Sequence, residues 1–212
     1  MSVLGRAGAT ATSAAVVIAA LAVGRLVSDH VESKISPDPF LREVAAGETA
    51  HLRFADIDVD RVNAADVLVS GSDVVKARGV FLVVDVTVRG TDKARALTGI
   101  ELVDTEGRIY GPDKSRAYCS FNLNAEPGLT TYARLCFDIP TLALEDVRLR
   151  VAQVDSAGGG ASQRRDEIGD LDLGISASEA RRMLAEELAL ATTNDPFTKP
   201  DPEPQPMPTE AS

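Results

Sequence analysis

The chain has 212 residues, of which 44% are hydrophobic and only 4% aromatic, and its formal net charge is -10. This length allows one ordinary domain with appendages, and the composition predicts a core built from aliphatic side chains. The acidic charge disfavours partners that present phosphates, so neither nucleic acid nor anionic lipid headgroups are expected as partners.

The first 28 residues contain the longest apolar stretch of the chain. Ala7–Gly24 carries no charge, and Ala14–Val23 within it is wholly apolar. We favour an uncleaved helical signal anchor, because the uncharged span is just long enough to cross a bilayer. A cleaved signal peptide is the main alternative, since Ala20-Leu21-Ala22 forms a small-x-small site behind a short apolar core. A buried helix of a soluble protein is the third interpretation.

Residues 29–47 combine prolines with scattered charges, which is typical of a linker. His51–Val62 predicts a strand in which a bulge near Ala55–Asp56 brings two apolar pairs onto one face. Val67–Val69 and Val74–Lys76 then flank a short polar turn, which indicates a hairpin or a strand–loop element.

Gly79–Arg89 is the segment around which the domain is expected to form. One side of an extended chain there is wholly apolar and the other side is half apolar. Both faces of such a strand are mostly covered, which predicts the central strand of a β-sandwich. Gly79 before the strand and Gly90 after it are expected to interrupt it. The wholly apolar side consists of Val80, Leu82, Val84, Val86 and Val88.

Further strands follow. Leu97–Val103 and Arg108–Tyr110 flank Asp104-Thr105-Glu106-Gly107, whose first Asp and last Gly favour a type I turn and hence a hairpin. Three aliphatic residues (Val147, Leu149 and Val151) alternate with Arg148, Arg150 and Ala152, which predicts a strand with one solvated face. Two more segments complete this part: a flexible Gly-rich loop at Ser156–Gln163 and a last short strand at Ile168–Ile175.

The two cysteines, Cys119 and Cys136, lie at equal distances from Pro127-Gly128. A hairpin between Cys119–Leu123 and Leu129–Ile139 would place them opposite each other, at a separation that a disulfide can bridge. We expect a structural disulfide, which requires an oxidising compartment and so places the N-terminus of an anchored chain inside. Two free thiols in the core are the alternative. Redox catalysis is not expected, because no C-x-x-C motif is present.

Asp56, Asp58 and Asp60 resemble the start of a calcium-binding loop. The match ends there, because Arg61 stands where such a loop needs Gly and Val67 where it needs a bidentate Glu. Aspartates two residues apart on a strand share its solvated face. We therefore predict no metal site, although a low-affinity cation site formed with a neighbouring loop stays open.

Catalytic motifs are not apparent. His30 and His51 have no Ser or Cys nearby in a nucleophile context, and the sequence has no Gly-rich phosphate loop, H-E-x-x-H or G-x-S-x-G motif. We expect no cofactor and no enzymatic activity, with a hydrolase kept as a further alternative. Tyr118, Phe121 and Tyr132 would pack across strands or line a small groove beside the cysteines.

The pattern changes at Ser176. Residues 176–191 predict an amphipathic helix that begins with a capping box formed by Ser176 and Glu179. Its apolar stripe is expected to dock on its own domain, with a partner surface as the alternative. Residues 192–212 contain six of the eleven prolines and predict a disordered acidic tail. The stripe consists of Ala180, Met183, Leu184, Leu188 and Ala191.

Short strands separated by turn signals, with no helical pattern between the N-terminal segment and Ser176, predict an all-β fold, namely an antiparallel β-sandwich over residues 48–175. Four segments carry a resemblance to a known family: Gly79–Val86, Leu102–Tyr110, Pro127-Gly128 and Phe137–Pro140. The chain resembles an extracytoplasmic domain of unknown function, common in Gram-positive and actinobacterial envelopes. That family shares the immunoglobulin-like fold of the immunoprotective extracellular antigen.

The resemblance covers Gly47–Ile175 and implies an immunoglobulin-like sandwich and an exported location. It brings no catalytic residues. The cysteine pair, the Gly-rich loop and the C-terminal helix depart from the family pattern, and they leave ligand and partner open.

These features together predict a non-catalytic envelope protein. It would be a single-pass membrane protein with its N-terminus inside, or a secreted protein if the N-terminal segment is cleaved. The domain would bind a protein in or on the membrane through sheet edges or loops. The alternative is an anchored or secreted binding protein for a small solute or a cation that uses the Asp56–Asp60 face.

Overall fold

A computed structural model describes residues 40–70, 73–112, 119, 123–154, 165–185, 189–191 and 199. The chain divides into two units, Met1–Asp38 and Pro39–Ser212, and all described residues belong to the second unit. The predicted anchor (1–28), the Gly-rich loop (Ser156–Gln163) and the tail apart from Lys199 lie outside the described residues.

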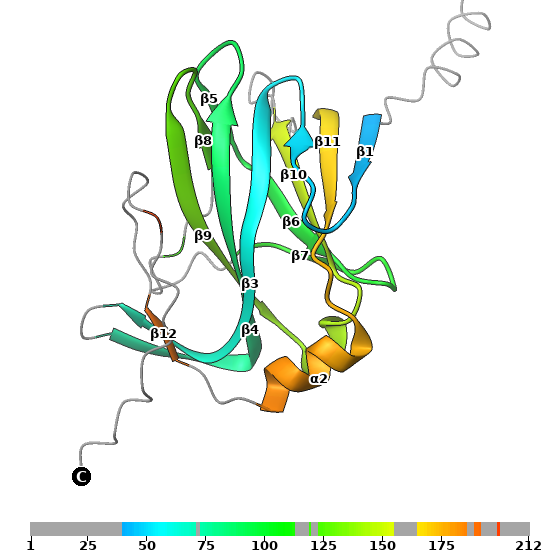
Figure 1. The fold of residues 1–212 in the computed structure, drawn as a ribbon. Helices are drawn as coiled ribbons and strands as arrows, with labels where there is room; N and C mark the ends of the chain where they lie inside the picture. Colours follow the sequence, from blue (N-terminus) through cyan, green and yellow to red (C-terminus); the bar gives the residue numbers. More distant parts are fainter. Residues whose placement is uncertain are drawn as a thin grey trace, which may run out of the picture. The chain divides into compact units, whose positions relative to one another are not determined.

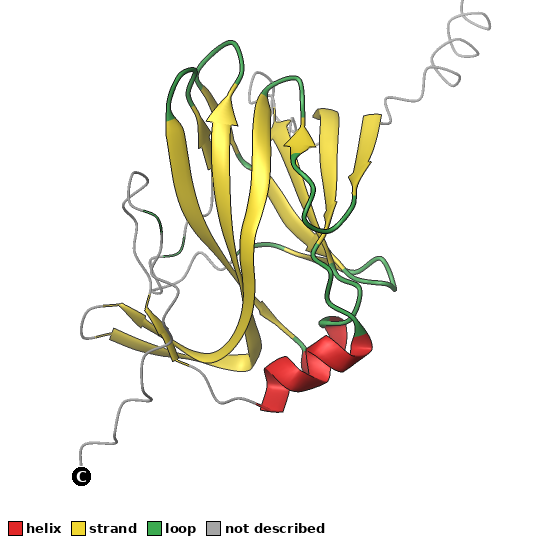
Figure 2. Cartoon of the chain, viewed as in Figure 1, coloured by secondary structure: helices red, strands yellow, loops and turns green. Residues whose placement is uncertain are grey.

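Two five-stranded sheets form a β-sandwich (Figures 1 and 2). The first sheet has the order β1-β11-β10-β6-β7, and the second has the order β12-β3-β4-β9 with β2 paired beside β3. A small third sheet joins β5 to β8. The bounds are β1 Phe40–Val44, β2 Ala50–His51, β3 Ala55–Ser70, β4 Asp73–Gly90, β5 Arg95–Leu97, β6 Gly99–Val103, β7 Ile109–Tyr110, β8 Leu123–Ala125, β9 Thr130–Ile139, β10 Arg148–Val154, β11 Arg165–Asp172 and β12 Ala189–Ala191.

The main core lies between the two large sheets. Val84 and Val86 of β4 belong to the same buried cluster as Leu102 of β6, Leu149 of β10 and Leu171 of β11. These side chains are aliphatic, as the low aromatic content predicts. Burial of each such side chain stabilises the fold by about 1.5–3 kcal/mol, so the alternating valines of β4 contribute strongly to the sandwich.

The predicted central strand is confirmed. β4 pairs with β3 on one side and with β9 on the other, and every residue from Val80 to Val88 is buried. The hairpin predicted at residues 67–76 is also present, with Val69 opposite Val74. It is not a separate element, however, because it is the shared tip of β3 and β4, which bend together below the sandwich (Figure 1).

Gly79 does not interrupt the strand, since β4 continues through it. The register of β4 against β3 shifts beside Gly79, and the backbone N–H groups of Arg78 and Gly79 donate to the Asp138 carboxylate at 3.2 and 3.3 Å. A Cβ atom on Gly79 would lie 2.2 Å from the backbone oxygen of Ile139. Glycine is therefore needed here for close approach of two strands, rather than as a strand breaker.

The start of the domain differs from the prediction in two ways. β1 lies within the predicted linker and forms an edge of the first sheet, so the domain begins before residue 48. His51–Val62 is not a single strand, because the chain turns after β2 and pairs it antiparallel with β3. The Leu52 N–H donates to the Ala55 carbonyl across that turn at 3.0 Å. A bulge does occur in β3, but between Val59 and Arg61.

The sandwich is not wholly antiparallel, because two edge strands pair in parallel: β1 with β11, and β12 with β3. β12 also corrects the predicted helix over 176–191. The helix α2 covers Ala177–Ala185 and the chain is extended again at Ala189–Ala191, where it adds to the edge of β3 at Val67–Val69.

The N-terminal cap and the docking face of α2 agree with the sequence. The Glu179 N–H donates to the Ser176 hydroxyl at 3.3 Å. Ala180 is buried and Met183 packs against the main core, whereas Leu184 is exposed. The N-terminal part of the predicted stripe, Ala180 and Met183, therefore docks on its own domain.

The predicted hairpin at residues 97–110 is present between β6 and β7, although Leu97 belongs to β5 and the third sheet. Asp104 closes its turn. The Asp104 carboxylate is buried and accepts hydrogen bonds from the Arg108 backbone and guanidinium, at 2.9 and 2.6 Å, and from the Tyr110 hydroxyl at 2.9 Å. Burial raises the pKa of Asp104, but the bonds from Arg108 and Tyr110 outweigh it and hold that pKa at about 2.

Candidate interaction surfaces

The outer face of the second sheet is buried along the middle of β4, whereas one face of an antiparallel sheet commonly meets water. Phe81, Val83, Asp85 and Thr87 of β4 point away from the main core, yet each is at most 6% exposed. Their neighbours on β9 divide this outer face into an apolar half around Cys136 and a charged half around Arg134.

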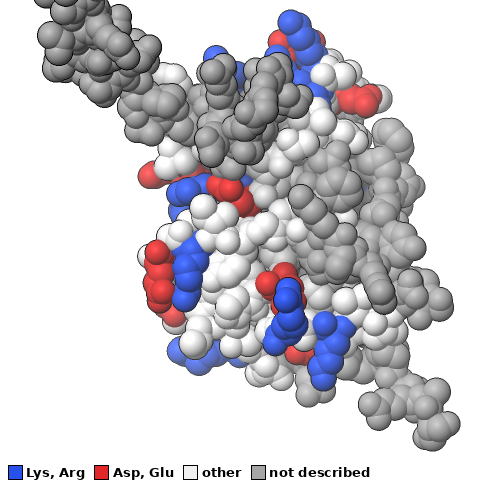
Figure 3. Space-filling view, turned by 180° about the vertical axis from the view of Figure 1, so that it is seen from behind, with Lys and Arg blue, Asp and Glu red and all other residues white. Residues whose placement is uncertain are grey.

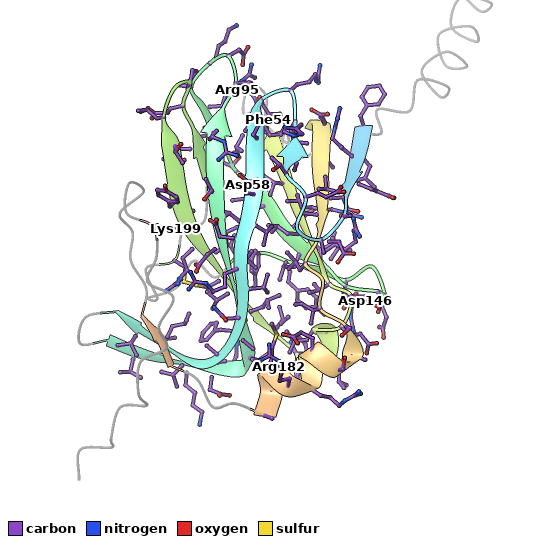
Figure 4. The ribbon with its side chains drawn as sticks, viewed as in Figure 1. Phe54, Asp58, Arg95, Asp146, Arg182 and Lys199 are labelled. Atoms are coloured by element: carbon purple, nitrogen blue, oxygen red, sulfur yellow. A yellow bond between two sulfur atoms is a disulfide. The ribbon has the colours of Figure 1, made fainter. Side chains whose placement is uncertain are left out.

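The apolar half is a second, smaller core that contains the disulfide. The predicted Cys119–Cys136 bond is confirmed, with 5.8 Å between the two Cα atoms, and Figure 4 shows it beside the second sheet. The predicted hairpin that would explain it is wrong, because β8 pairs with β5 rather than with β9. The disulfide therefore joins β9 to Cys119, which lies outside the described strands. The cluster consists of Ala65, Leu68, Phe81, Val83, Cys119 and Cys136.

The charged half contains a fully buried ion pair. Asp85 of β4 stands opposite Arg134 of β9, and the guanidinium donates Nε and Nη2 to the two carboxylate oxygens at 2.7 and 2.8 Å. The Arg61 Nη1 atom lies 3.8 Å from the same carboxylate and is itself buried without a hydrogen bond. The cost of removing both charged groups from water offsets much of their attraction, so a buried ion pair adds little net stability. Its main effect here is to fix how β9 aligns with β4.

Two of the three candidate aspartates are engaged by other side chains of the same surface. Asp56 lies 2.8 Å from the His51 ring nitrogen Nδ1. Asp58, labelled in Figure 4, accepts hydrogen bonds from the Arg89 guanidinium and the Thr49 hydroxyl. Both carboxylates thus serve pairs that join β3 to its neighbouring chain segments.

Asp60 lies at the bulge of β3 and has two partners. The Thr87 hydroxyl donates to Asp60 Oδ2 at 2.6 Å, and the Lys199 ammonium donates to Oδ1 at 2.9 Å. The Asp60 carboxylate raises the pKa of Lys199 above its usual value. A residue from the C-terminal part therefore contacts the same strand that carries the three aspartates (Figure 4).

Within the described ranges, no group of three or more His, Cys, Asp or Glu side chains could hold a metal ion. His51 is exposed and paired with Asp56, and Tyr132 stands opposite Thr87 on the outer face. His30, Tyr118 and Phe121 lie outside the described residues. The arrangement of the described charged side chains is that of structural ion pairs.

The outer face of the first sheet also carries paired charges. Arg148 and Arg150 of β10 both donate to the Asp170 carboxylate of β11, at 2.9 and 3.1 Å. In the view from behind, basic and acidic side chains lie beside one another rather than in fields of one sign (Figure 3). The solvated face predicted for residues 147–152 is therefore present at Arg148 and Arg150, whose charges are paired, whereas Ala152 on the same predicted face is buried.

A pocket of about 430 Å³ opens at the edge of the sandwich beside β1. Its apolar walls are Phe40 and Leu41, and its charged walls are Arg42, Arg53 and Glu167. The Glu167 carboxylate is only 5% exposed and accepts the Arg42 Nε–H at 3.0 Å and the Arg53 backbone N–H at 2.8 Å. Glu167 thereby fixes two arginines whose side chains remain largely exposed.

A second pocket, of about 250 Å³, adjoins the first through Arg53. Arg95 enters it and donates to Gln153 and to Asp92, while its own Nε atom is buried without a hydrogen bond. The sequence did not single out either pocket. The local sequence signal for the first pocket was the short apolar pair Phe40-Leu41. The prolines and charges around this pair favour a linker, so the pair was predicted to lie in one.

No protein-family model matches the chain, and no curated protein matches it. Among solved structures, it is similar to the yjhA protein from Bacillus subtilis, at 17% identity and a TM-score of 0.43 over 61% of this chain and 98% of that one. It is also similar to an uncharacterized β-sandwich protein from Clostridium difficile 630, at 14% identity and a TM-score of 0.38 over 64% and 96% of the two chains. A conserved hypothetical protein from Bacillus anthracis is 21% identical, with a TM-score of 0.40 over 50% and 87%.

No helix in the described part of the chain is long and apolar enough to span a bilayer. The predicted anchor at residues 1–28 lies outside that part.

Proposed function

We propose that the chain is a non-catalytic envelope protein whose β-sandwich lies outside the cytoplasm and binds another envelope or membrane protein. Its N-terminal segment would hold it in the membrane with the N-terminus inside. The sandwich would belong to the immunoglobulin-like group that the sequence resemblance implies. The observation that carries the proposal is the Cys119–Cys136 disulfide on the buried outer face.

The disulfide supports an extracytoplasmic location because such bonds persist in oxidising compartments and are rare in the cytosol. Both cysteines are buried, and their spacing in the sequence is not that of a C-x-x-C motif, which would favour redox exchange. The apolar segment before residue 28 supplies a route of export, either as an anchor or as a cleaved signal.

A binding role is supported by the way the charged side chains are used. The Asp85–Arg134 pair and the pairs of Asp56, Asp58 and Asp60 join strands to one another. Such pairs stabilise one arrangement of the chain and engage these carboxylates in contacts within the fold. Sheet edges such as β1 are the surfaces through which a sandwich adds a partner.

The test is fractionation of a bacterium that expresses the full chain, followed by protease treatment of spheroplasts. The proposal predicts a membrane-bound protein whose sandwich is reached by external protease after the wall is removed. Recovery of the protein in the medium would select the cleaved form. Recovery of an intact, protease-protected protein in the cytosol would contradict the proposal.

A binding protein for a small solute is the second candidate function, and the pocket beside Arg95 favours it. The buried, unpartnered Nε atom of Arg95 suits an anion small enough for a pocket of about 250 Å³. Inorganic phosphate should then raise the melting temperature of the protein but not that of an Arg95→Lys variant. For a cation, by contrast, the carboxylates of Asp56–Asp60 already have other partners.

A further inference from the structure

We propose that the chain segment after α2 is a two-state switch. In the strand state, Ala189–Ala191 forms β12 on the edge of β3, as Figure 1 shows. In the helix state, the same three residues leave β3 and continue α2. The change between the two states opens and closes the edge of β3 at Val67–Val69. This inference goes beyond the proposed function and does not depend on where the sandwich is located.

The sequence of this segment favours a helix. Residues 185–191 read Ala-Glu-Glu-Leu-Ala-Leu-Ala, and these three residue types are among the strongest helix formers. Ala and Glu are also depleted in strands. Gly and Pro, which commonly mark the end of a helix, are absent from residues 176–191, and the next proline is Pro196. Ala189–Ala191 is nevertheless extended, so contacts with the rest of the domain hold the strand state against the local preference.

The backbone contacts of the strand state are few. β12 pairs with β3 over three residues, from Ala189 opposite Val67 to Ala191 opposite Val69. The pairing is parallel, which is slightly less stable per residue than antiparallel pairing. β12 is also the last strand in its sheet, so within the described residues only one of its sides is paired. The two states therefore lie close in free energy, and we expect the helix state in about 1–10% of molecules.

A second contact holds the strand state at the bulge of β3. The Lys199 ammonium donates to Asp60 Oδ1 at 2.9 Å, and the Lys199 side chain is 53% exposed. An exposed ion pair contributes little stability and is weakened by salt. The Thr87 hydroxyl donates to the other Asp60 oxygen at 2.6 Å, so the carboxylate stays in place when Lys199 leaves. This ion pair is the part of the strand state that solution conditions can change.

The ion pair and the strand are coupled through the length of the chain. Three residues span about 10 Å in a strand but only about 5 Å in a helix. Conversion to the helix state draws Ala191 back toward α2, whose start stays fixed because Ala180 is buried and Met183 packs on the main core. This retraction disfavours the contact of Lys199 with Asp60. The ion pair therefore favours the strand state, and its loss favours the helix state.

The strand state covers an edge that the helix state opens. Val67 and Leu68 are buried, and Leu68 belongs to the small core that contains the disulfide. When β12 leaves, the backbone groups of Val67–Val69 lose it as their partner. Backbone groups at an open sheet edge pair readily with an extended segment of another chain. β12 thus acts as a built-in cover, and the switch controls access to this edge.

The first experiment uses the full chain in detergent micelles, with its alanines labelled with 13C. The 13Cα chemical shifts of Ala189 and Ala191 distinguish a helix from a strand and from unordered chain. Lys199→Gln removes the ion pair and should raise the helix population by about two- to fivefold, which moves both shifts toward helical values. Added salt should move the wild-type shifts in the same direction. Lys93→Gln is the matched control, because Lys93 is exposed and lies outside this segment, and it should leave both shifts unchanged.

The second experiment biases the switch in the opposite direction. Ala189→Thr combined with Ala191→Thr lowers the helix propensity and favours a strand. The helix population should fall by about threefold for each residue changed. The measurement is amide hydrogen exchange at Val67–Val69, which should become slower because the edge opens less often. Ala96→Thr, at an exposed alanine of β5, is the control and should leave this exchange unchanged.

The two experiments can each overturn the switch. Shifts of the Lys199→Gln variant that move toward unordered values would show that the segment only frays, and would refute the helix state. Shifts that stay at the wild-type values would refute the coupling between the ion pair and the strand. Exchange at Val67–Val69 that is equal to wild type or faster in the double threonine variant would show that the helix state does not open this edge.

Discussion

Asp85 of β4 and Arg134 of β9 lie directly opposite each other and form a bidentate ion pair whose side chains are 1% and 2% exposed. They stand on the outer face, beside a small core that includes the disulfide. A buried pair of this kind fits only one register of its two strands. We infer that the pair fixes the alignment of β9 against β4, a role that buried ion pairs fill in some other systems.

Removing one partner of this pair should be severely destabilising. Arg134→Ala leaves the buried Asp85 carboxylate without its two hydrogen bonds, with only the Arg61 guanidinium 3.8 Å away, and should lower the free energy of unfolding by about 3–5 kcal/mol. Asp85→Leu combined with Arg134→Leu removes both charges and should lower it much less. Urea unfolding followed by circular dichroism measures both. Equal losses in the single and double variants would contradict the role given to the pair.

Loss of the disulfide should weaken the fold by a different route. Cys119→Ala with Cys136→Ala opens a loop of sequence separation 17 and should reduce stability by about 3 kcal/mol. Reduction of the wild-type protein with a strong reductant should give a similar loss in urea unfolding. A double variant as stable as the oxidised protein would show that the bond contributes nothing to the fold.

Gly79→Ala should be destabilising although it is a small change. The new Cβ would lie 2.2 Å from the Ile139 backbone oxygen, so β4 and β9 must separate, at a cost of about 1–3 kcal/mol. Gly111→Ala is the matched control, because its Cβ would meet nothing within 4 Å. The melting temperature of the control should stay at the wild-type value, and equal shifts in the two variants would refute the steric explanation.

Asp104 should make stability depend on pH in the acid range. Its pKa is about 2 in the folded chain against an ordinary 3.8, so the unfolded chain binds the proton more readily. The stabilisation is therefore complete above about pH 4 and is lost as the pH falls through about 2. Asp104→Asn should be less stable than wild type at pH 7, and the difference should shrink on acidification. A constant difference across this range would contradict the assignment.

The interior of the domain could be predicted from the sequence because alternation is a local signal. Every second residue of Val80–Val88 is aliphatic, which sets the face toward the main core without knowledge of any partner strand. The disulfide was predicted correctly from the wrong geometry. Spacing about Pro127-Gly128 implies a simple hairpin, whereas the strand before the turn pairs with β5 instead.

The edges and the candidate surfaces could not be predicted in the same way. β1 and β12 are short, and they pair in parallel with strands more than 100 residues away along the chain, which leaves no local pattern. Ala189–Ala191 forms a strand instead of the predicted end of the helix, because the edge of β3 supplies backbone hydrogen-bond partners. The pocket at Phe40 depends on Glu167 and Arg53, which come together only in the folded chain.

We propose that this sandwich matures, closed by its disulfide, outside the cytoplasm. Intact mass spectrometry of the protein isolated from its native cells, alkylated before and after reduction, tests it most directly. Neither Cys119 nor Cys136 should be alkylated until the protein is reduced. Alkylation of both cysteines without reduction, in protein from undamaged cells, would contradict it.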